Sequence, residues 1–161
     1  MKLSDIRTAL REIRLSPAKR LGQNFLHDQN LARWIIDQAQ ITPDDYVVEI
    51  GPGLGALTRL ILDKGAHVLA IEKDARLADF LRAHIRHERL EILNMDALKF
   101  DSRSLFAHRR VKLLGNLPYN ISSALLLRFH EQPNPISLSM LMLQKEMAMR
   151  KHLQSRMAKT V

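Results

Sequence analysis

The sequence predicts an α/β protein with a doubly wound, mostly parallel sheet, and three observations lead to this fold class. Short apolar runs alternate with helical stretches along most of the 161 residues. The helical stretches are long enough to carry the chain from one parallel strand to the next. Glycine-rich or polar segments follow directly after several apolar runs, which is where sheets of this kind bind ligands. The length suits one globular domain.

The expected elements follow one another in a regular order. Apolar side chains at helical spacing favour an amphipathic helix at residues 29–40, before the first strand. These side chains are Leu31, Trp34, Ile35 and Ala39. Five apolar runs are expected to be strands, at residues 46–50, 67–72, 90–95, 111–115 and 136–143. Residues 56–65 and 75–85 are expected to be helices between them.

Composition limits the class of protein. The chain has no cysteine, so neither a disulfide nor a thiolate metal site can form. The seven His residues lack metal-ligand spacing, and we expect no metal. No apolar run approaches the roughly 20 residues that a membrane-spanning helix needs. The N-terminus has no apolar signal core. We therefore expect a cytoplasmic protein without a membrane partner, with a mitochondrial location as a minor alternative.

The net charge of +8 is unevenly distributed along the chain. Residues 1–22 hold six Lys or Arg against two acidic residues, and residues 139–161 hold five against one. All the excess positive charge therefore lies at the two ends. Such clusters can attract a phosphate backbone, although basic ends can equally be solvated surface. Charge alone leaves both interpretations open.

The first predicted strand leads directly into a glycine-rich segment, EIGPGLGALT. Gly51 and Gly53 let the backbone bend sharply and approach a ligand, while the following helix presents free N–H groups. Glu72 ends the second strand, where a carboxylate can accept hydrogen bonds from both hydroxyls of a ribose. Gly51, Gly53 and Ala56 also satisfy the dinucleotide fingerprint, so NAD stays open as a ligand.

Polar residues also follow the third and fourth predicted strands. Asp96 could accept a hydrogen bond from the amine of an adenine, although a single Asp there is most often a helix cap or turn residue. Asn116 opens the segment NLPYNIS. Its carboxamide oxygen and a backbone carbonyl could accept both N–H groups of a base amine, freeing the lone pair. Pro118 would orient that carbonyl, and Tyr119 could stack on the base.

Six segments stand in a fixed order along the chain: GQNFLHD (22–28), VEIGPGLGALT (48–58), AIEKD (70–74), MDAL (95–98), NLPYNIS (116–122) and MLQKEMAMR (142–150). Together they resemble the rRNA adenine N6,N6-dimethyltransferase family, and GQNFLHD and LQKE are most similar to its bacterial 16S rRNA, kasugamycin-sensitivity branch. The resemblance implies a Rossmann-like methyltransferase fold with S-adenosylmethionine as cofactor. It also implies N6-dimethylation of adjacent adenines in a 16S rRNA loop of the immature small ribosomal subunit.

The resemblance implies a role for each matching position. The cofactor would be held by Asn24, Leu26, Gly51, Gly53, Glu72, Asp96, Ala97 and Asn116. Among these, Glu72 would hold the ribose, and Asp96 with Ala97 the adenine. The catalytic residues would be Asn116, Pro118 and Tyr119, with Tyr119 stacked on the target adenine.

The family's sequence normally continues past LQKE through two more strands and a small helical domain, whereas this chain leaves the pattern near Lys151. We therefore expect a fragment that lacks these last parts. Its expected divisions are a basic arm at residues 1–22, an incomplete methyltransferase domain at 23–150, and a divergent basic tail at 151–161. The strand at 136–143 would then lie at an edge of the sheet.

Three classes of function stay open. The first is the rRNA methyltransferase, either active or as an inactive fragment. The second is a non-catalytic RNA-binding or ribosome-assembly factor. The third is an NAD-dependent oxidoreductase, which leaves NLPY unexplained and lacks an evident acid for hydride transfer.

Overall fold

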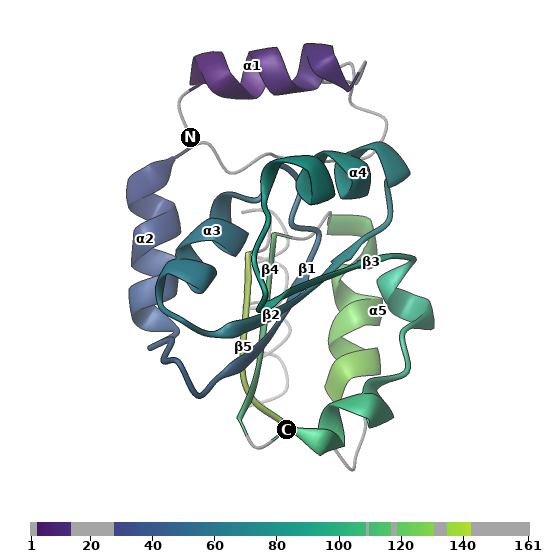
Figure 1. Cartoon of the computed structure of the whole chain (residues 1–161). Helices are drawn as coiled ribbons and strands as arrows, with labels where there is room; N and C mark the ends of the chain where they lie inside the picture. The colour runs from purple at the N-terminus through teal and green to yellow at the C-terminus, as the bar shows by residue number, and fades with distance from the viewer. Residues whose placement is uncertain (1–2, 14–27, 109, 117–118, 131–134, 143–161) are drawn as a thin grey trace, which may run out of the picture.

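The computed structural model describes residues 3–13, 28–108, 110–116, 119–130 and 135–142, and it contains a five-stranded parallel sheet. The strands are β1 (Tyr46–Ile50), β2 (His67–Glu72), β3 (Leu90–Asn94), β4 (Val111–Asn116) and β5 (Ile136–Met142). Their order in the sheet is β3-β2-β1-β4-β5 (Figure 1). The chain thus runs outward from β1 to β3, then returns to the other side of β1 with β4. This is the doubly wound arrangement that the sequence predicts, and the fold class is confirmed.

Helices cover both faces of the sheet. The α-helices are α1 (Leu3–Glu12), α2 (Gln29–Gln38), α3 (Ala56–Asp63), α4 (Ala75–His84) and α5 (Tyr119–His130). Two short 3₁₀-helices, η1 (Ala97–Lys99) and η2 (Ser102–Ala107), lie between β3 and β4. In Figure 1, α2 and α3 lie on one side of the sheet and α5 on the other, with α1 across α4. No helix in the described part of the chain is long and apolar enough to cross a membrane.

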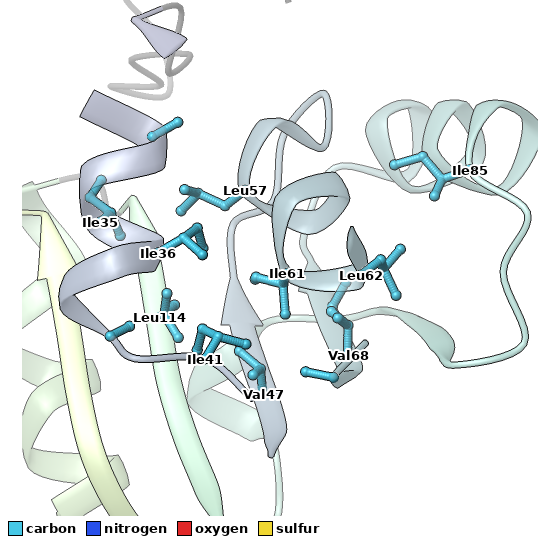
Figure 2. Packing of buried hydrophobic residues seen from close by; sticks show 14 of the residues in the cluster. Ile35, Ile36, Ile41, Val47, Leu57, Ile61, Leu62, Val68, Ile85 and Leu114 are labelled. Atoms are coloured by element: carbon cyan, nitrogen blue, oxygen red, sulfur yellow. The ribbon is translucent and has the colours of Figure 1, made fainter. Parts of the chain in front are cut away.

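The alternation of side chains along each strand divides the core into two halves. On one face, Val47 of β1 and Leu114 of β4 pack with Ile36 of α2 and Ile61 of α3 (Figure 2). All four are nearly inaccessible to solvent, at 2% exposed or less. Successive strand residues point to opposite faces, so the next residues along belong to the other half of the core.

The second half of the core lies under α5 and the two 3₁₀-helices. Val48 and Leu113 pack there with Leu105 of η2. Phe129 of α5 stacks nearly parallel to Phe100, with ring centroids 6.1 Å apart. With apolar side chains on both faces, the strands read as continuous apolar runs, as expected for a parallel sheet covered on both sides.

The apolar stripe predicted for α2 is only partly right. Ile35 and Ala39 are buried as predicted, whereas Leu31 and Trp34 are 41% and 57% exposed. The buried face of α2 and its C-cap is rotated away from Leu31 and Trp34 and consists of Ala32, Ile35, Ile36 and Ala39. These positions follow the helical repeat of three and four residues, so the small Ala32 takes the place at the sheet that the larger Leu31 was expected to fill.

The predicted strand bounds hold to within one residue. β1 and β2 have the predicted bounds, and β3 ends one residue early at Asn94. β5 is described as far as Met142, and Leu143 lies outside the described residues. β4 continues to Asn116 because that residue still pairs with Met142 of β5. Of the strands that the structure describes, β3 and β5 lie at the edges of the sheet.

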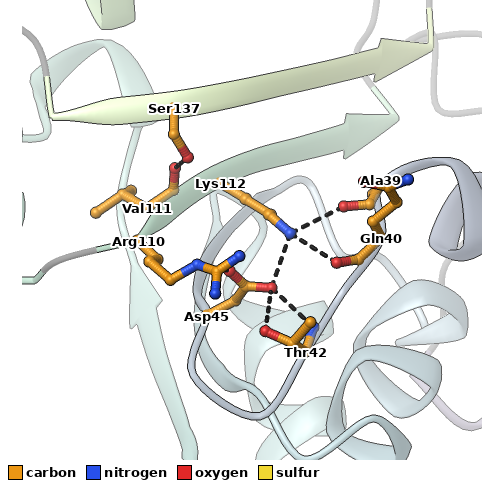
Figure 3. Close-up of polar contacts among 8 residues, drawn as sticks. All are labelled: Ala39, Gln40, Thr42, Asp45, Arg110, Val111, Lys112 and Ser137. Carbon is orange, nitrogen blue, oxygen red and sulfur yellow. Dashed lines mark hydrogen bonds and ion pairs between the residues drawn. The ribbon is translucent and has the colours of Figure 1, made fainter.

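A buried ion pair ties the loop after α2 to the amino end of the sheet. Lys112 of β4 donates from Nζ to Oδ2 of Asp45 at 2.8 Å, and also to the carbonyl oxygens of Ala39 (3.0 Å) and Gln40 (2.8 Å) (Figure 3). Burial acts to raise the pKa of Asp45, but hydrogen bonds from Lys112 and Thr42 outweigh it and lower the pKa below its ordinary value. This network lies at the opposite end of the strands from the glycine-rich segment.

Candidate functional site at the carboxyl edge of the sheet

The candidate site lies where β1, β2, β3 and β4 end. Ile50, the last residue of β1, pairs with Ile71 of β2 and with Gly115 of β4. Gly51 therefore follows β1 at the level where β4 reaches Asn116. The strand order reverses between β1 and β4, and ligands of doubly wound sheets bind at that point.

The glycine loop, residues 51–55, has a backbone that only glycine adopts readily. Gly51, Gly53 and Gly55 all have positive φ, at 67°, 60° and 81°. A Cβ on Gly55 would lie 2.5 Å from Cδ1 of Ile85 and 2.9 Å from Cδ2 of Leu81, so α4 packs directly against the loop. The loop then enters α3, whose first N–H groups have no partner within the helix, and the N–H of Thr58 among them interacts with the buried carboxylate of Glu49.

Glu72 links the end of β2 to the glycine loop. Its Oε2 accepts a hydrogen bond from the Gly53 N–H at 3.2 Å, and its Oε1 accepts one from the Asp74 N–H at 2.9 Å. The residue is only 2% exposed. Burial raises the pKa of Glu72, which the backbone N–H groups oppose and the charge of Asp74 supports. The backbone N–H of Lys73 also faces this carboxylate, so three backbone donors fix its position at the end of β2.

Asp96 lies beside Glu72 through contacts between the ends of β2 and β3. Lys73 Nζ contacts Asp96 Oδ2 at 2.8 Å, and Asn94 Nδ2 donates to the Glu72 carbonyl oxygen at 2.9 Å. Asp96 also caps η1, because its Oδ1 accepts from the Leu98 N–H at 3.1 Å. The hydrogen bond from Lys73 and that from Leu98 lower the pKa of Asp96. Asp96 thus has the capping role that the sequence left open, and its side chain remains 24% exposed.

Ala97 follows Asp96 as the first residue of η1 and is 6% exposed. It belongs to the core half under α5.

Some of the predicted site residues lie outside what the structure describes. Asn24, Leu26 and Pro118 are outside the described residues. For Asn116 and Tyr119 the structure describes the backbone: Asn116 ends β4 and Tyr119 begins α5. The structure therefore brings together the glycine loop, Glu72 and Asp96, and it puts the backbone of Asn116 at the same edge of the sheet.

A buried acid beneath the glycine loop was not singled out from the sequence. Glu49 of β1 is 2% exposed, and its Oε2 accepts a hydrogen bond of 2.6 Å from Oγ1 of the fully buried Thr58 of α3. Burial raises the pKa of Glu49 to about 7, and the neighbouring charge of Glu72 adds to this. The available signal was a charged residue inside the apolar run YVVEI. Glu49 and Thr58 join the strand before the loop to the helix after it.

Comparison with known proteins places this architecture among RNA methyltransferases. The family model described as ribosomal RNA adenine dimethylase matches residues 15–159. The chain is 42% identical over 131 residues to ribosomal RNA small subunit methyltransferase A of Malacoplasma penetrans, covering 81% of this chain and 47% of the relative. It is 47% identical over 135 residues to the protein of the same name from Francisella tularensis, covering 82% and 52%. The chain spans about half the length of the curated relatives it matches.

Solved structures agree with the sequence comparison. The crystal structure of 23S rRNA methyltransferase ErmE aligns with a TM-score of 0.70 and 34% identity, covering 78% of this chain and 50% of that one. A dimethyladenosine transferase from Plasmodium falciparum aligns with a TM-score of 0.66 and 30% identity, covering 79% and 46%. The sheet described here is thus the Rossmann-like sheet of methyltransferases.

Proposed function

The chain belongs to the ribosomal RNA adenine dimethylase family, and from this premise we propose that it uses S-adenosylmethionine to methylate N6 of adjacent adenines in small-subunit rRNA. The RNA partner we propose is a 16S rRNA loop within the immature small ribosomal subunit. We place the reaction in the cytoplasm, with the mitochondrion as the alternative for an organellar relative.

The observation that carries this proposal is the hydrogen bond between the Gly53 N–H and Glu72, 3.2 Å long. It fixes a buried carboxylate against a loop whose glycines leave room for a ligand at the backbone. A carboxylate in that position suits the two hydroxyls of a ribose, and Gly51 and Gly53 suit the methionine end of the cofactor. Asp96 and Ala97, at the end of the next strand, would then hold its adenine. Asn24 and Leu26 would close over it.

The transfer step needs alignment more than acid or base chemistry. When bound, S-adenosylmethionine supplies a methyl group on a positively charged sulfur, which leaves as a neutral thioether. The Asn116 side-chain oxygen and the carbonyl before Pro118 would accept the two N–H groups of the target amine and free its lone pair. That nitrogen then gains the methyl group and loses one proton to solvent. Tyr119 would hold the base by stacking, so the reacting atoms meet in one orientation.

The target base must leave its stack to reach this edge of the sheet. Enzymes that modify a base act on single strands or on a flipped nucleotide, since the reacting atom is inaccessible inside a duplex. A loop of rRNA satisfies this requirement. The excess positive charge of the chain, +8 overall, favours association with such a phosphate-rich partner.

Methyl transfer to purified small-subunit RNA, measured with labelled S-adenosylmethionine, tests the proposal. We expect transfer by the intact chain and a loss of roughly 100-fold or more in Asn116→Ala, the size of effect seen when one group that stabilises a transition state is removed. Asn30→Ala, on the exposed surface of α2, is the matched control and should retain the activity. Equal activity in both variants would contradict the role of Asn116.

A non-catalytic RNA-binding or assembly factor is the second candidate, favoured by the clustering of basic residues near both ends of the chain. It predicts RNA binding without methyl transfer by the intact chain. An NAD-dependent oxidoreductase is not favoured by the family to which the chain belongs. Titration with NAD should accordingly show no binding.

A further inference from the structure

The N-terminal helix shares a hydrophobic cluster with the glycine loop. Ala9 and Leu10 of α1 are each 6% exposed, and they pack in one cluster with Leu54, Leu77 and Phe80. Leu54 lies in the middle of the glycine loop, and Leu77 and Phe80 belong to α4. In Figure 1, α1 lies across α4, beyond the carboxyl edge of the sheet. Leu54 is 3% exposed and belongs to the same cluster as Ala9 and Leu10 of α1.

One polar contact joins the last turn of α1 to the end of α4. Glu12 Oε1 lies 3.5 Å from Nε2 of His84, at the end of α4. The His84 ring stacks on Phe80, with centroids 4.0 Å apart, and its Nδ1 is 2.9 Å from the Phe80 carbonyl oxygen. Arg59 of α3 reaches the His84 carbonyl oxygen at 3.3 Å. The end of α1 is therefore joined to α4, and α4 to the helix that follows the glycine loop.

The glycine loop is thus held on three sides. The Glu72 carboxylate, at the end of β2, accepts a hydrogen bond from the Gly53 N–H, and α4 packs against Gly55. The third contact is the burial of Leu54, whose hydrophobic cluster includes side chains of α1. If α1 left its place, Leu54 would lose apolar cover and the backbone on either side of it would be freer to move.

We propose that α1 is a positioning element for the cofactor. Docking of α1 through Leu10 holds Leu54, and so keeps the neighbouring Gly53 in the conformation that accepts S-adenosylmethionine. Leu10 and Leu54 are positioning residues, since they act through the loop. The link to the cofactor rests on the proposed function, whereas the link between α1 and the loop stands on the packing alone. By reciprocity, bound cofactor must stabilise docked α1 by the same factor by which docked α1 favours the cofactor.

Four variants separate this link from a general loss of stability. Leu10→Ala removes the contact of α1, and Leu10→Met restores most of its volume. Leu105→Ala is the matched control: Leu105 is equally large and 1% exposed, but lies in η2 on the other face of the sheet. Ile13→Ala, a half-buried position packed against the same cluster as Leu10, gives a milder version of the first change if Leu10→Ala does not fold.

Two readouts are measured at a temperature where all the variants are folded. Hydrogen exchange at the Gly53 and Gly55 amides reports on the loop, because these N–H groups bond to Glu72 and to the Pro52 carbonyl oxygen. We expect Leu10→Ala to speed exchange at both amides by about tenfold, a local opening of ordinary size. Calorimetric titration of Leu10→Ala with S-adenosylmethionine should show a dissociation constant about tenfold higher than that of the parent chain, because cofactor binding is coupled to the docking of α1. Leu10→Met should approach the parent chain in both readouts.

The outcomes distinguish the positioning role of α1 from the proposed function of the chain. Unchanged exchange at Gly53 and Gly55 in Leu10→Ala, or an equal increase in Leu105→Ala, overturns the positioning role of α1. A dissociation constant that stays at the parent value while exchange rises would also overturn it. Should the parent chain itself not bind S-adenosylmethionine, the proposed function fails, and the exchange experiment still decides whether α1 holds the loop.

Discussion

Replacing Glu49 by glutamine is expected to remove a pH dependence of stability that originates under the glycine loop. Glu49 is buried, and burial raises its pKa from 4.5 to about 7, with the nearby charge of Glu72 adding to the effect. Glutamine has nearly the same shape and can still accept the hydrogen bond from Thr58. The substitution therefore removes the titration and keeps most of the packing.

The direction and size of the effect follow from proton linkage. Because the pKa of Glu49 is higher in the folded chain than in the unfolded chain, the folded chain binds the extra proton between pH 4.5 and about 7. Its free energy of unfolding therefore falls as pH rises through that window. Each unit of pKa difference corresponds to about 1.4 kcal/mol, so the ionised Glu49 costs the folded chain about 3 kcal/mol above pH 7.

Urea unfolding of the parent chain and Glu49→Gln, at several pH values from 4.5 to 8, measures this difference. We expect the stability of Glu49→Gln relative to the parent to rise by up to about 3 kcal/mol across the window. Thr58→Val is the companion variant: it removes a hydrogen bond that lowers the pKa of Glu49, so it should make the total fall in stability larger and extend it to higher pH. A difference between the parent and Glu49→Gln that stays constant with pH would refute the reasoning.

Two further substitutions test other parts of the structure. Lys112→Met removes the cation 2.8 Å from the buried carboxylate of Asp45 and leaves it with Thr42 and the more distant Arg110, so it should lower the free energy of unfolding by up to about 3 kcal/mol in urea titrations. Adding Asp45→Asn should recover part of the loss, and no recovery would contradict the account of this pair. Gly55→Ala must adopt φ near 81° with its Cβ against Ile85, so it should cost at least about 1 to 2 kcal/mol of stability and weaken cofactor binding. An unchanged melting temperature and affinity would show that α4 does not constrain the loop.

The strands and their positions along the chain were the most predictable part of the fold. The apolar runs at residues 46–50 and 67–72 became β1 and β2 without change, because each is bounded by turn-forming residues. The ends of β3 and β4 shifted by one residue, because pairing with a neighbouring strand decides where a strand stops. The resemblance to the rRNA adenine dimethyltransferases is confirmed by the family match over residues 15–159.

Ion pairs between residues far apart in the sequence, and the burial of individual side chains, were harder to predict from the sequence. Asp45 and Lys112 are 67 residues apart, and nothing in their local sequence indicates a buried pair. The packing of Ala9 and Leu10 against α4 was not predicted. The positive charge of residues 1–22 favoured a solvated or nucleic-acid-binding arm instead. A helical spacing of apolar residues in this segment was the signal that could have indicated it.

The sequence predicted which residues lie at the candidate site, but not the hydrogen bonds that they form there. That Glu72 and Asp96 would lie at one edge follows from a parallel sheet, since the strands end at the same side. The bond from Gly53 to Glu72 and the capping of η1 by Asp96 depend on loop conformations that the sequence does not specify. The roles assigned to Asn24, Leu26, Asn116, Pro118 and Tyr119 stay predictions.

Calorimetric titration of residues 1–161 with S-adenosylmethionine, alongside Glu72→Gln, tests most directly whether the carboxyl edge of the sheet is a nucleoside site. We expect one equivalent to bind to the parent chain, and affinity to fall by about tenfold or more in Glu72→Gln, since a charged hydrogen-bond acceptor at the ribose is lost. Binding that is absent from the parent chain, or equally tight in the variant, would contradict the account.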